Sequence, residues 1–111
     1  MDAADDLVAV VANLRKEHQN EPWPERLNVL EVAGVDLVSL DTRLEGCTYT
    51  WVANGGALHE RGMGTVRLVL GQLEKVLPEL TGDDSPHIWH RLHRMAHLIV
   101  AHHTPPAETA S

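Results

Sequence analysis

The chain has 111 residues, a length that predicts one domain. Its hydrophobic share of 43% is ordinary for a folded protein and too high for a disordered one. Sixteen acidic residues against nine basic ones give a formal charge of −7, which disfavours binding to a nucleic-acid backbone.

The sequence predicts a cytoplasmic protein that does not enter a membrane. Cys47 is the single cysteine, so no disulfide can form within the chain. No apolar run approaches the length of a membrane span. The acidic start of the chain also lacks the cationic region of a secretory signal peptide.

The first predicted helix covers about residues 3–19. Apolar residues recur there at helical spacing, at Leu7, Val10, Val11 and Leu14. Acidic side chains lie at its start and basic ones at its end, as the helix dipole favours. The turn around Pro22 and Pro24 ends it.

Residues 25–53 favour a second helix with a heptad seam. Leu30, Leu37, Leu44 and Trp51 follow one another at intervals of seven residues, which is the spacing of a helix-packing seam. The first half is apolar on nearly every side and therefore predicts a covering partner. These four residues form the predicted interface of a homodimer or of a complex with another protein.

The same stretch also permits a β-hairpin. Residues 27–32 and 35–40 read as short strands on either side of Ala33 and Gly34, because β-branched residues are frequent there. The helix is favoured because the seven-residue spacing continues past Gly34 and Gly46. The sequence leaves open which of the two forms occurs.

A third helix is predicted for about residues 64–77, with a start as early as residue 57 as a variant. Several glycines crowd its entry, and Pro78 ends or bends it. Its predicted buried face consists of Val66, Val69, Leu70, Leu73, Val76 and Leu77.

The fourth helix has the clearest sequence signals. Ser85 is a favourable N-cap and Pro86 suits the first helical position. The predicted end is near His103, and residues 104–111 are expected to form a disordered tail. The apolar stripe of this helix contains Ile88, Leu92, Met95, Ala96 and Ile99.

Together these elements predict an all-α protein. We expect a bundle of three or four antiparallel helices in a single domain over residues 1–103.

A stripe of histidines marks the fourth helix. His90, His93 and His97 lie on one side of it, opposite the apolar stripe. Histidines one turn apart can share a metal ion, so these three are predicted ligands for zinc or nickel, with Glu74 and Glu60 as further donors. A second hypothesis is a pH-responsive surface, because clustered histidines gain charge together near pH 6.

One short pattern resembles an enzyme family. Arg91, Leu92 and, five residues later, His97 resemble the Arg-hydrophobic-His signature of HEPN-type ribonucleases. The resemblance implies a small helical bundle that acts as a dimer. It also implies that Arg91 stabilises charge on the phosphate and that His97 is the general acid or base.

The sequence as a whole favours a non-enzymatic protein-interaction module. Such a module would be an adaptor, a regulatory protein or an immunity-type partner that self-associates through its apolar helical face, with no cofactor. Two further hypotheses remain: a metal-binding or pH-responsive protein that uses the histidine stripe, and a ribonuclease that uses Arg91 and His97.

Overall fold

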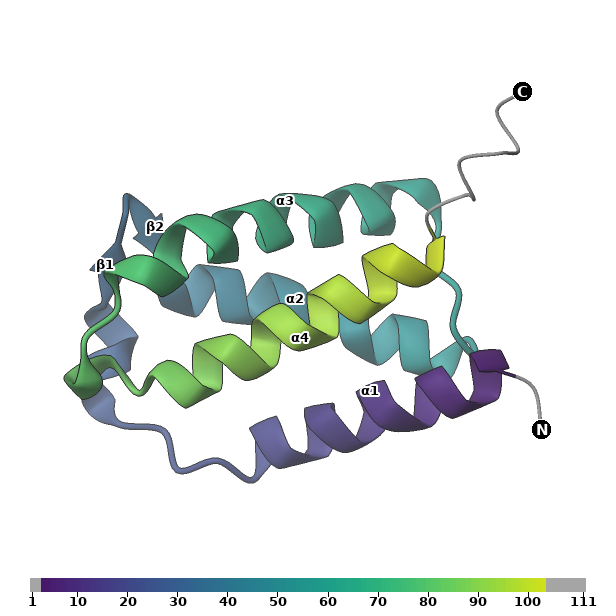
Figure 1. Cartoon of the computed structure of the whole chain (residues 1–111), viewed down its shortest axis with the longest axis horizontal. Helices are drawn as coiled ribbons and strands as arrows, with labels where there is room; N and C mark the ends of the chain where they lie inside the picture. Colours follow the sequence, from purple (N-terminus) through teal and green to yellow (C-terminus); the bar gives the residue numbers. More distant parts are fainter. Residues whose placement is uncertain (1–2, 104–111) are drawn as a thin grey trace.

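Four helices pack side by side in the computed structural model, which describes residues 3–103 (Figure 1). The predicted all-α bundle is therefore confirmed, whereas the tail predicted at 104–111 lies outside the described residues. The helices are α1 (Ala3–Gln19), α2 (Leu37–Ala53), α3 (Glu60–Val76) and α4 (Pro86–His103). The short elements are η1 (Glu25–Val29), β1 (Glu31–Val32), β2 (Val35–Asp36), η2 (Leu77–Glu79) and η3 (Gly82–Asp84).

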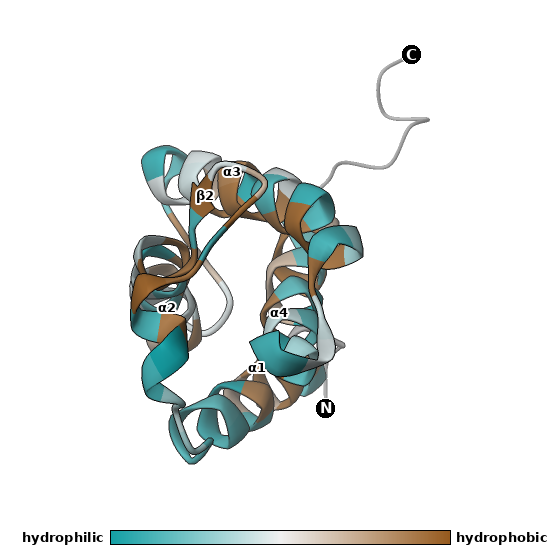
Figure 2. Ribbon diagram, turned by 90° about the vertical axis from the view of Figure 1, so that its left-hand side faces the viewer, coloured by the Kyte–Doolittle hydropathy of each residue, from teal (hydrophilic) through white to brown (hydrophobic). Residues whose placement is uncertain are grey.

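Successive helices run antiparallel. Figure 1 shows the chain passing from one end of the bundle to the other and back with each helix. Seen along the bundle, the four helices form a four-sided arrangement whose hydrophobic segments turn inward (Figure 2). α4 packs against each of the other three helices, so its inner face is the centre of the core and its outer face is left to solvent.

α1 forms as its amphipathic pattern predicts. Asp5 and Asp6 lie in its first turn, and Lys16 and His18 lie in its last turn, as the helix dipole favours. Its buried apolar side is narrow, because only Val11 and Leu14 are buried hydrophobic residues among the described side chains of this helix.

The prediction of one helix over residues 25–53 is wrong for its first half. Residues 25–36 form a 3₁₀ turn and a short antiparallel hairpin, in which Glu31 pairs with Asp36 and Val32 pairs with Val35. The hairpin alternative is confirmed in kind, although its strands are shorter than the sequence suggested. The helix begins only at Leu37.

Backbone conformation explains why the hairpin forms. The two loop residues, Ala33 and Gly34, have φ angles of 52° and 78°. A two-residue hairpin of type I′ needs positive φ at both positions, and these angles interrupt any helix. The heptad spacing that runs across Gly34 therefore carries no helical information before Leu37.

Local capping sets the ends of α2. The side chain of Asp36 accepts a hydrogen bond from the backbone N–H of Ser39, at 3.2 Å, and so fixes the first turn. At the other end the chain turns at Gly55 and Gly56, whose φ angles of 69° and 98° suit glycine. Gly56 is also buried, with a Val8 methyl 3.1 Å from where a Cβ would lie.

α3 begins at Glu60, four residues before the main predicted start and within the predicted variant. His59 provides the reason, because its Nδ1 accepts a hydrogen bond from the N–H of Gly62, at 3.1 Å. Histidine is an uncommon cap, so the sequence signal was weak. Val76 ends the helix, and Pro78 follows in η2, as predicted.

α4 begins at Pro86 and ends at His103, as predicted. The predicted N-cap residue, Ser85, has a φ of 54° and so differs from an ordinary N-cap residue, which has an extended backbone. The preceding turn is fixed by Asp84, whose carbonyl oxygen accepts the indole N–H of Trp89 at 2.8 Å. Its carboxylate also pairs with Arg26, at 2.7 Å, and so ties η1 to the start of α4.

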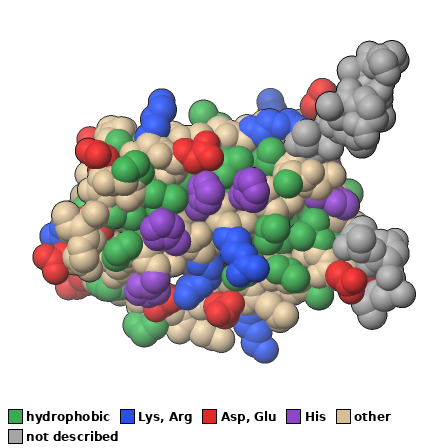
Figure 3. All heavy atoms as spheres, viewed as in Figure 1, with side chains coloured by type: hydrophobic (Ala, Val, Ile, Leu, Met, Phe, Trp, Pro, Cys, Tyr) green, Lys and Arg blue, Asp and Glu red, His purple; other side chains and the backbone are tan. Residues whose placement is uncertain are grey.

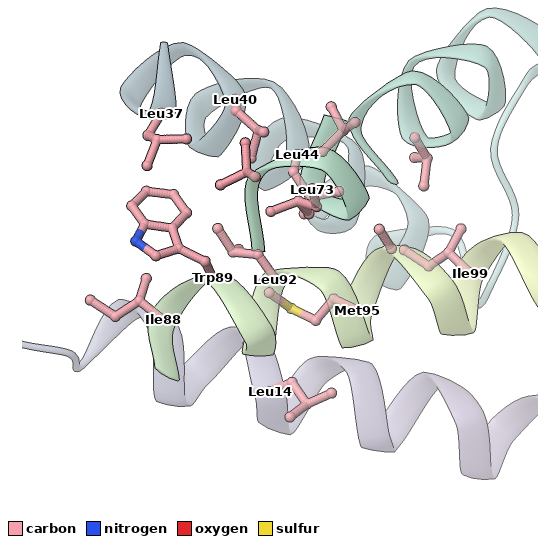
Figure 4. Packing of buried hydrophobic residues seen from close by; sticks show 14 of the residues in the cluster. Leu14, Leu37, Leu40, Leu44, Leu73, Ile88, Trp89, Leu92, Met95 and Ile99 are labelled. Carbon is pink, nitrogen blue, oxygen red and sulfur yellow. The ribbon is translucent and has the colours of Figure 1, made fainter. Parts of the chain in front are cut away.

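The core is aliphatic with two tryptophans, Trp51 and Trp89, which have no solvent exposure. Side chains from the facing helices meet there (Figure 4). Within residues 3–103, no helix has the length and apolar character needed to cross a bilayer. Fully buried members of the core include Leu37, Leu40, Leu44, Leu73, Ile88, Leu92, Met95 and Ile99.

Candidate functional site

The outer side of α4 carries the side chains that distinguish this surface. We call His87, His90, His93, Arg94 and His97 the histidine face. At about 100° per residue these five positions lie opposite the apolar stripe of the helix. His93 is half-buried and the other four are exposed. Figure 3 shows histidine side chains in a row across this side of the molecule, with arginine or lysine side chains beside the row.

The charge of α4 is opposite to that of the rest of the chain. The helix contains six of the eight histidines, two arginines and no carboxylate. The rest of the chain holds all sixteen acidic residues and seven of the nine basic ones. An acidic protein therefore presents one helix whose outer surface has only neutral or positive side chains.

A carboxylate from α3 lies beside the middle of the histidine face. Glu74 Oε2 is 3.5 Å from Nε2 of His93. The ring of His93 in turn stacks on that of His97, with the planes 12° apart and the ring centres 6.1 Å apart. These three side chains form one contiguous group that bridges α3 and α4.

A second carboxylate lies near the start of α4. Glu21, from the segment after α1, accepts a hydrogen bond from Arg91 at 2.8 Å and lies 3.1 Å from Nε2 of His87. The hydrogen bond from Arg91, followed by that from His87, holds the pKa of Glu21 below its ordinary value. Arg91 is therefore occupied in joining α4 to the end of α1.

The structure brings together two of the three predicted metal ligands. His93 and His97 are in ring contact, whereas His90, one turn before His93, is exposed and contacts no ring of the described residues. Glu74, which the sequence named as a donor without placing it, is beside His93. In their present positions, the described side chains form no group of three that would hold a metal ion.

The two residues of the ribonuclease-like pattern have separate partners. Arg91 pairs with Glu21, and its side chain is 18% exposed. His97 stacks on His93. The role of Arg91 and His97 as a catalytic pair stays a prediction.

The predicted interface residues belong to the interior of the chain. Leu37, Leu44 and Trp51 have no solvent exposure, and Leu30 is half-buried beside the core. Thr48, one position after Cys47, completes the buried side of α2. Much of the apolar excess that suggested a partner for residues 25–53 is therefore covered within the chain, although Val29 stays 88% exposed.

Cys47 is half-buried, and burial raises the pKa of its thiol, as expected for a structural cysteine. Its Sγ lies 3.8 Å from the carbonyl oxygen of Gly62, between α2 and α3.

The end of α4 is fastened to α2 by a contact that the sequence did not predict. The indole N–H of Trp51 donates to Nε2 of His103, at 2.9 Å. Burial, together with the nearby charges of His102 and Arg67, lowers the pKa of His103. His103 is therefore held as the neutral acceptor of this bond.

The described residues enclose no pocket, so the candidate site is a surface. Comparison with protein-family models, curated proteins and solved structures found no match.

Proposed function

We propose that the protein is an interaction module whose docking surface is the histidine face of α4. The partner is a protein that presents an acidic helical segment. The observation that supports this proposal is the charge of α4, which has no carboxylate in a chain with a formal charge of −7. Such a contrast steers an acidic partner toward one helix and away from the rest of the surface.

Two residues of this face are available to a partner. Among residues 3–103, the side chains of His90 and Arg94 have no ion-pair or hydrogen-bond partner, and both are exposed. Their neighbours His87 and His93 lie against Glu21 and Glu74. A partner protein can therefore supply the acidic groups that pair with His90 and Arg94.

The dimensions of α4 suit a helical partner. Its 18 residues span about 27 Å, which equals some five turns of a second helix. A polyanion of high charge density, such as nucleic acid, is less suitable because the chain as a whole has a formal charge of −7 and repels it.

The proposal moves the docking surface from the seam at Leu30, Leu37, Leu44 and Trp51 to α4. The sequence predicts self-association through the apolar helical face, and a homodimer stays a prediction. In the arrangement that we propose, an acidic face of a second copy would instead take the partner's place on α4. The proposal includes a cytoplasmic location, which suits a chain with one half-buried thiol.

A glutamate-rich helical peptide provides the test, with a glutamine-substituted peptide for comparison. We expect the protein to bind the glutamate peptide in calorimetry and to lose affinity as salt is raised. Arg94→Glu should weaken binding by about tenfold or more, since a like charge then faces the peptide. Arg43→Glu is the matched control, because Arg43 is an exposed arginine on α2.

Three results would contradict this function. Equal binding of the two peptides would remove the electrostatic basis, and equal loss in Arg43→Glu would show that the effect is not local. Stronger binding of single-stranded DNA than of the glutamate peptide would assign the face to nucleic acid. Light scattering in the same buffers tests the second copy, because a dimer that Arg94→Glu dissociates makes another chain the acidic partner.

A further inference from the structure

We propose that Glu74, His93 and His97 bind one zinc ion between α3 and α4. The site depends on the contacts of these three side chains and not on the docking function. Carboxylate and imidazole donors are ordinary zinc ligands, and two helices supply them here from adjacent positions.

The first two donors already have the separation that one ion requires. Zinc lies about 2.1 Å from an imidazole nitrogen or a carboxylate oxygen, so two ligands at a tetrahedral angle are roughly 3.4 Å apart. Nε2 of His93 and Oε2 of Glu74 are 3.5 Å apart. The separation of these two atoms therefore matches that of two ligands of one ion.

His97 is the third donor. It lies one turn after His93, with its ring nearly parallel to that of His93 at a centre-to-centre distance of 6.1 Å. Because no three described donors are yet positioned around one point, the His97 side chain has to rotate toward the ion. Its exposed position leaves space for that rotation.

The backbone under the site is fixed by the core. Each proposed ligand directly follows a side chain with no solvent exposure: Leu73 precedes Glu74, Leu92 precedes His93 and Ala96 precedes His97. Ligands on packed helices keep their relative positions better than ligands on loops. Only side-chain rotation is therefore needed for binding.

Three protein ligands leave the fourth position of zinc open. A water molecule can fill it in the isolated protein. A carboxylate from an acidic partner is a second candidate, and in that form the site would strengthen the docking proposed above.

The experiment is titration of the full chain, purified without an affinity tag, with zinc sulfate in calorimetry. We expect one zinc ion per chain. His93→Ala, His97→Ala and Glu74→Gln should each weaken binding by about tenfold or more, since even outer-shell changes cost 10–100-fold in metal affinity. His90→Ala is the matched control and should change affinity by less than about twofold.

A second measurement keeps structural effects apart from metal binding. Zinc should raise the melting temperature of the native protein and of His90→Ala, because a ligand that binds only the folded state stabilises it. At the same zinc concentration it should raise the melting temperature of Glu74→Gln by less than that of the native protein. Circular dichroism without zinc confirms that each variant folds.

Absence of saturable zinc binding would overturn the proposal. So would an equal loss in His90→Ala, or full affinity in Glu74→Gln, because the site would then not bridge the helices. No acidic peptide is present in these titrations. Normal zinc binding without peptide binding would therefore contradict the docking function alone.

Discussion

α1 and α4 are helices of nearly equal length that are held in the bundle by different forces. α4 buries six residues, five of them large, against the other helices. α1 buries only two of its described apolar side chains, Val11 and Leu14, packs two more partly against the core, and also contacts α2 through polar groups. Arg15 pairs with Glu45 at 2.7 Å, and His18 pairs with Asp41 at 2.6 Å.

The difference shows where the stability of the bundle resides. Burial of apolar surface stabilises the fold with no requirement for direction, whereas a buried ion pair loses most of its attraction to desolvation. We call the polar contacts between α1 and α2 the polar seam, and some of its atoms lack a hydrogen-bond partner. Among the described residues, these buried atoms are Nε of Arg15, Nδ1 of His18 and Oε2 of Glu45. The α3–α4 pair is thus the stable frame, and it carries both proposed sites.

The largest expected effect on stability comes from a substitution among the buried apolar residues of α4. Leu92→Ala should lower the free energy of unfolding by about 2–5 kcal/mol, because it leaves a cavity at the centre of the core. Leu14→Ala, the same change in α1, should cost less because Leu14 lies at 8% exposure near the edge. Urea unfolding followed by circular dichroism measures both. An equal or greater loss at Leu14 would contradict the comparison.

A smaller effect is expected in the polar seam. His18→Leu leaves the carboxylate of Asp41 without its partner and should cost about 1–3 kcal/mol. The double variant His18→Leu/Asp41→Leu should recover most of that loss, since replacing both partners of a buried hydrogen bond by apolar groups can be nearly neutral. If the double variant were less stable than the single one in urea unfolding, the loss in His18→Leu would not come from the unpaired carboxylate of Asp41.

The smallest effect on stability concerns the hydrogen bond from Trp51 of α2 to His103 of α4, which we call the clasp. This effect depends on pH. The pKa of His103 is below its ordinary value of 6.5, so the imidazole of His103 binds a proton more tightly in the unfolded chain than in the folded chain. The stability that depends on a neutral His103 is therefore fully present above pH 6.5. It is lost as the pH falls from 6.5 toward the lower pKa of His103 in the folded chain.

His103→Gln tests this clasp, because glutamine can still accept from Trp51 but does not titrate. Between about pH 8 and pH 5, the variant should lose less stability than the native protein. Urea midpoints at both pH values give the comparison. Identical pH profiles for the two proteins would show that His103 does not contribute to acid sensitivity.

Local signals in the sequence were sufficient for the helices with periodic apolar faces and flanking prolines. α1 and α4 formed where they were predicted, because proline, charge placement and 3.6-residue spacing all indicated the same bounds. The local signals gave the wrong prediction between residues 25 and 36, where the seven-residue spacing of leucines indicated a helix and a two-residue turn formed instead. The positive φ angles at Ala33 and Gly34 decided the outcome.

The sequence by itself determined that His90, His93 and His97 lie on the solvent side of a helix, because side-chain direction in a helix depends only on spacing. Tertiary structure alone decided which carboxylates approach them. Glu21 and Glu74 lie 70 and 19 residues from their closest partners, Arg91 and His93, so only the packing of the helices brings them together. It also decided that Leu37, Leu44 and Trp51 are interior residues, since a periodic apolar stripe does not specify whether its own chain or a partner covers it.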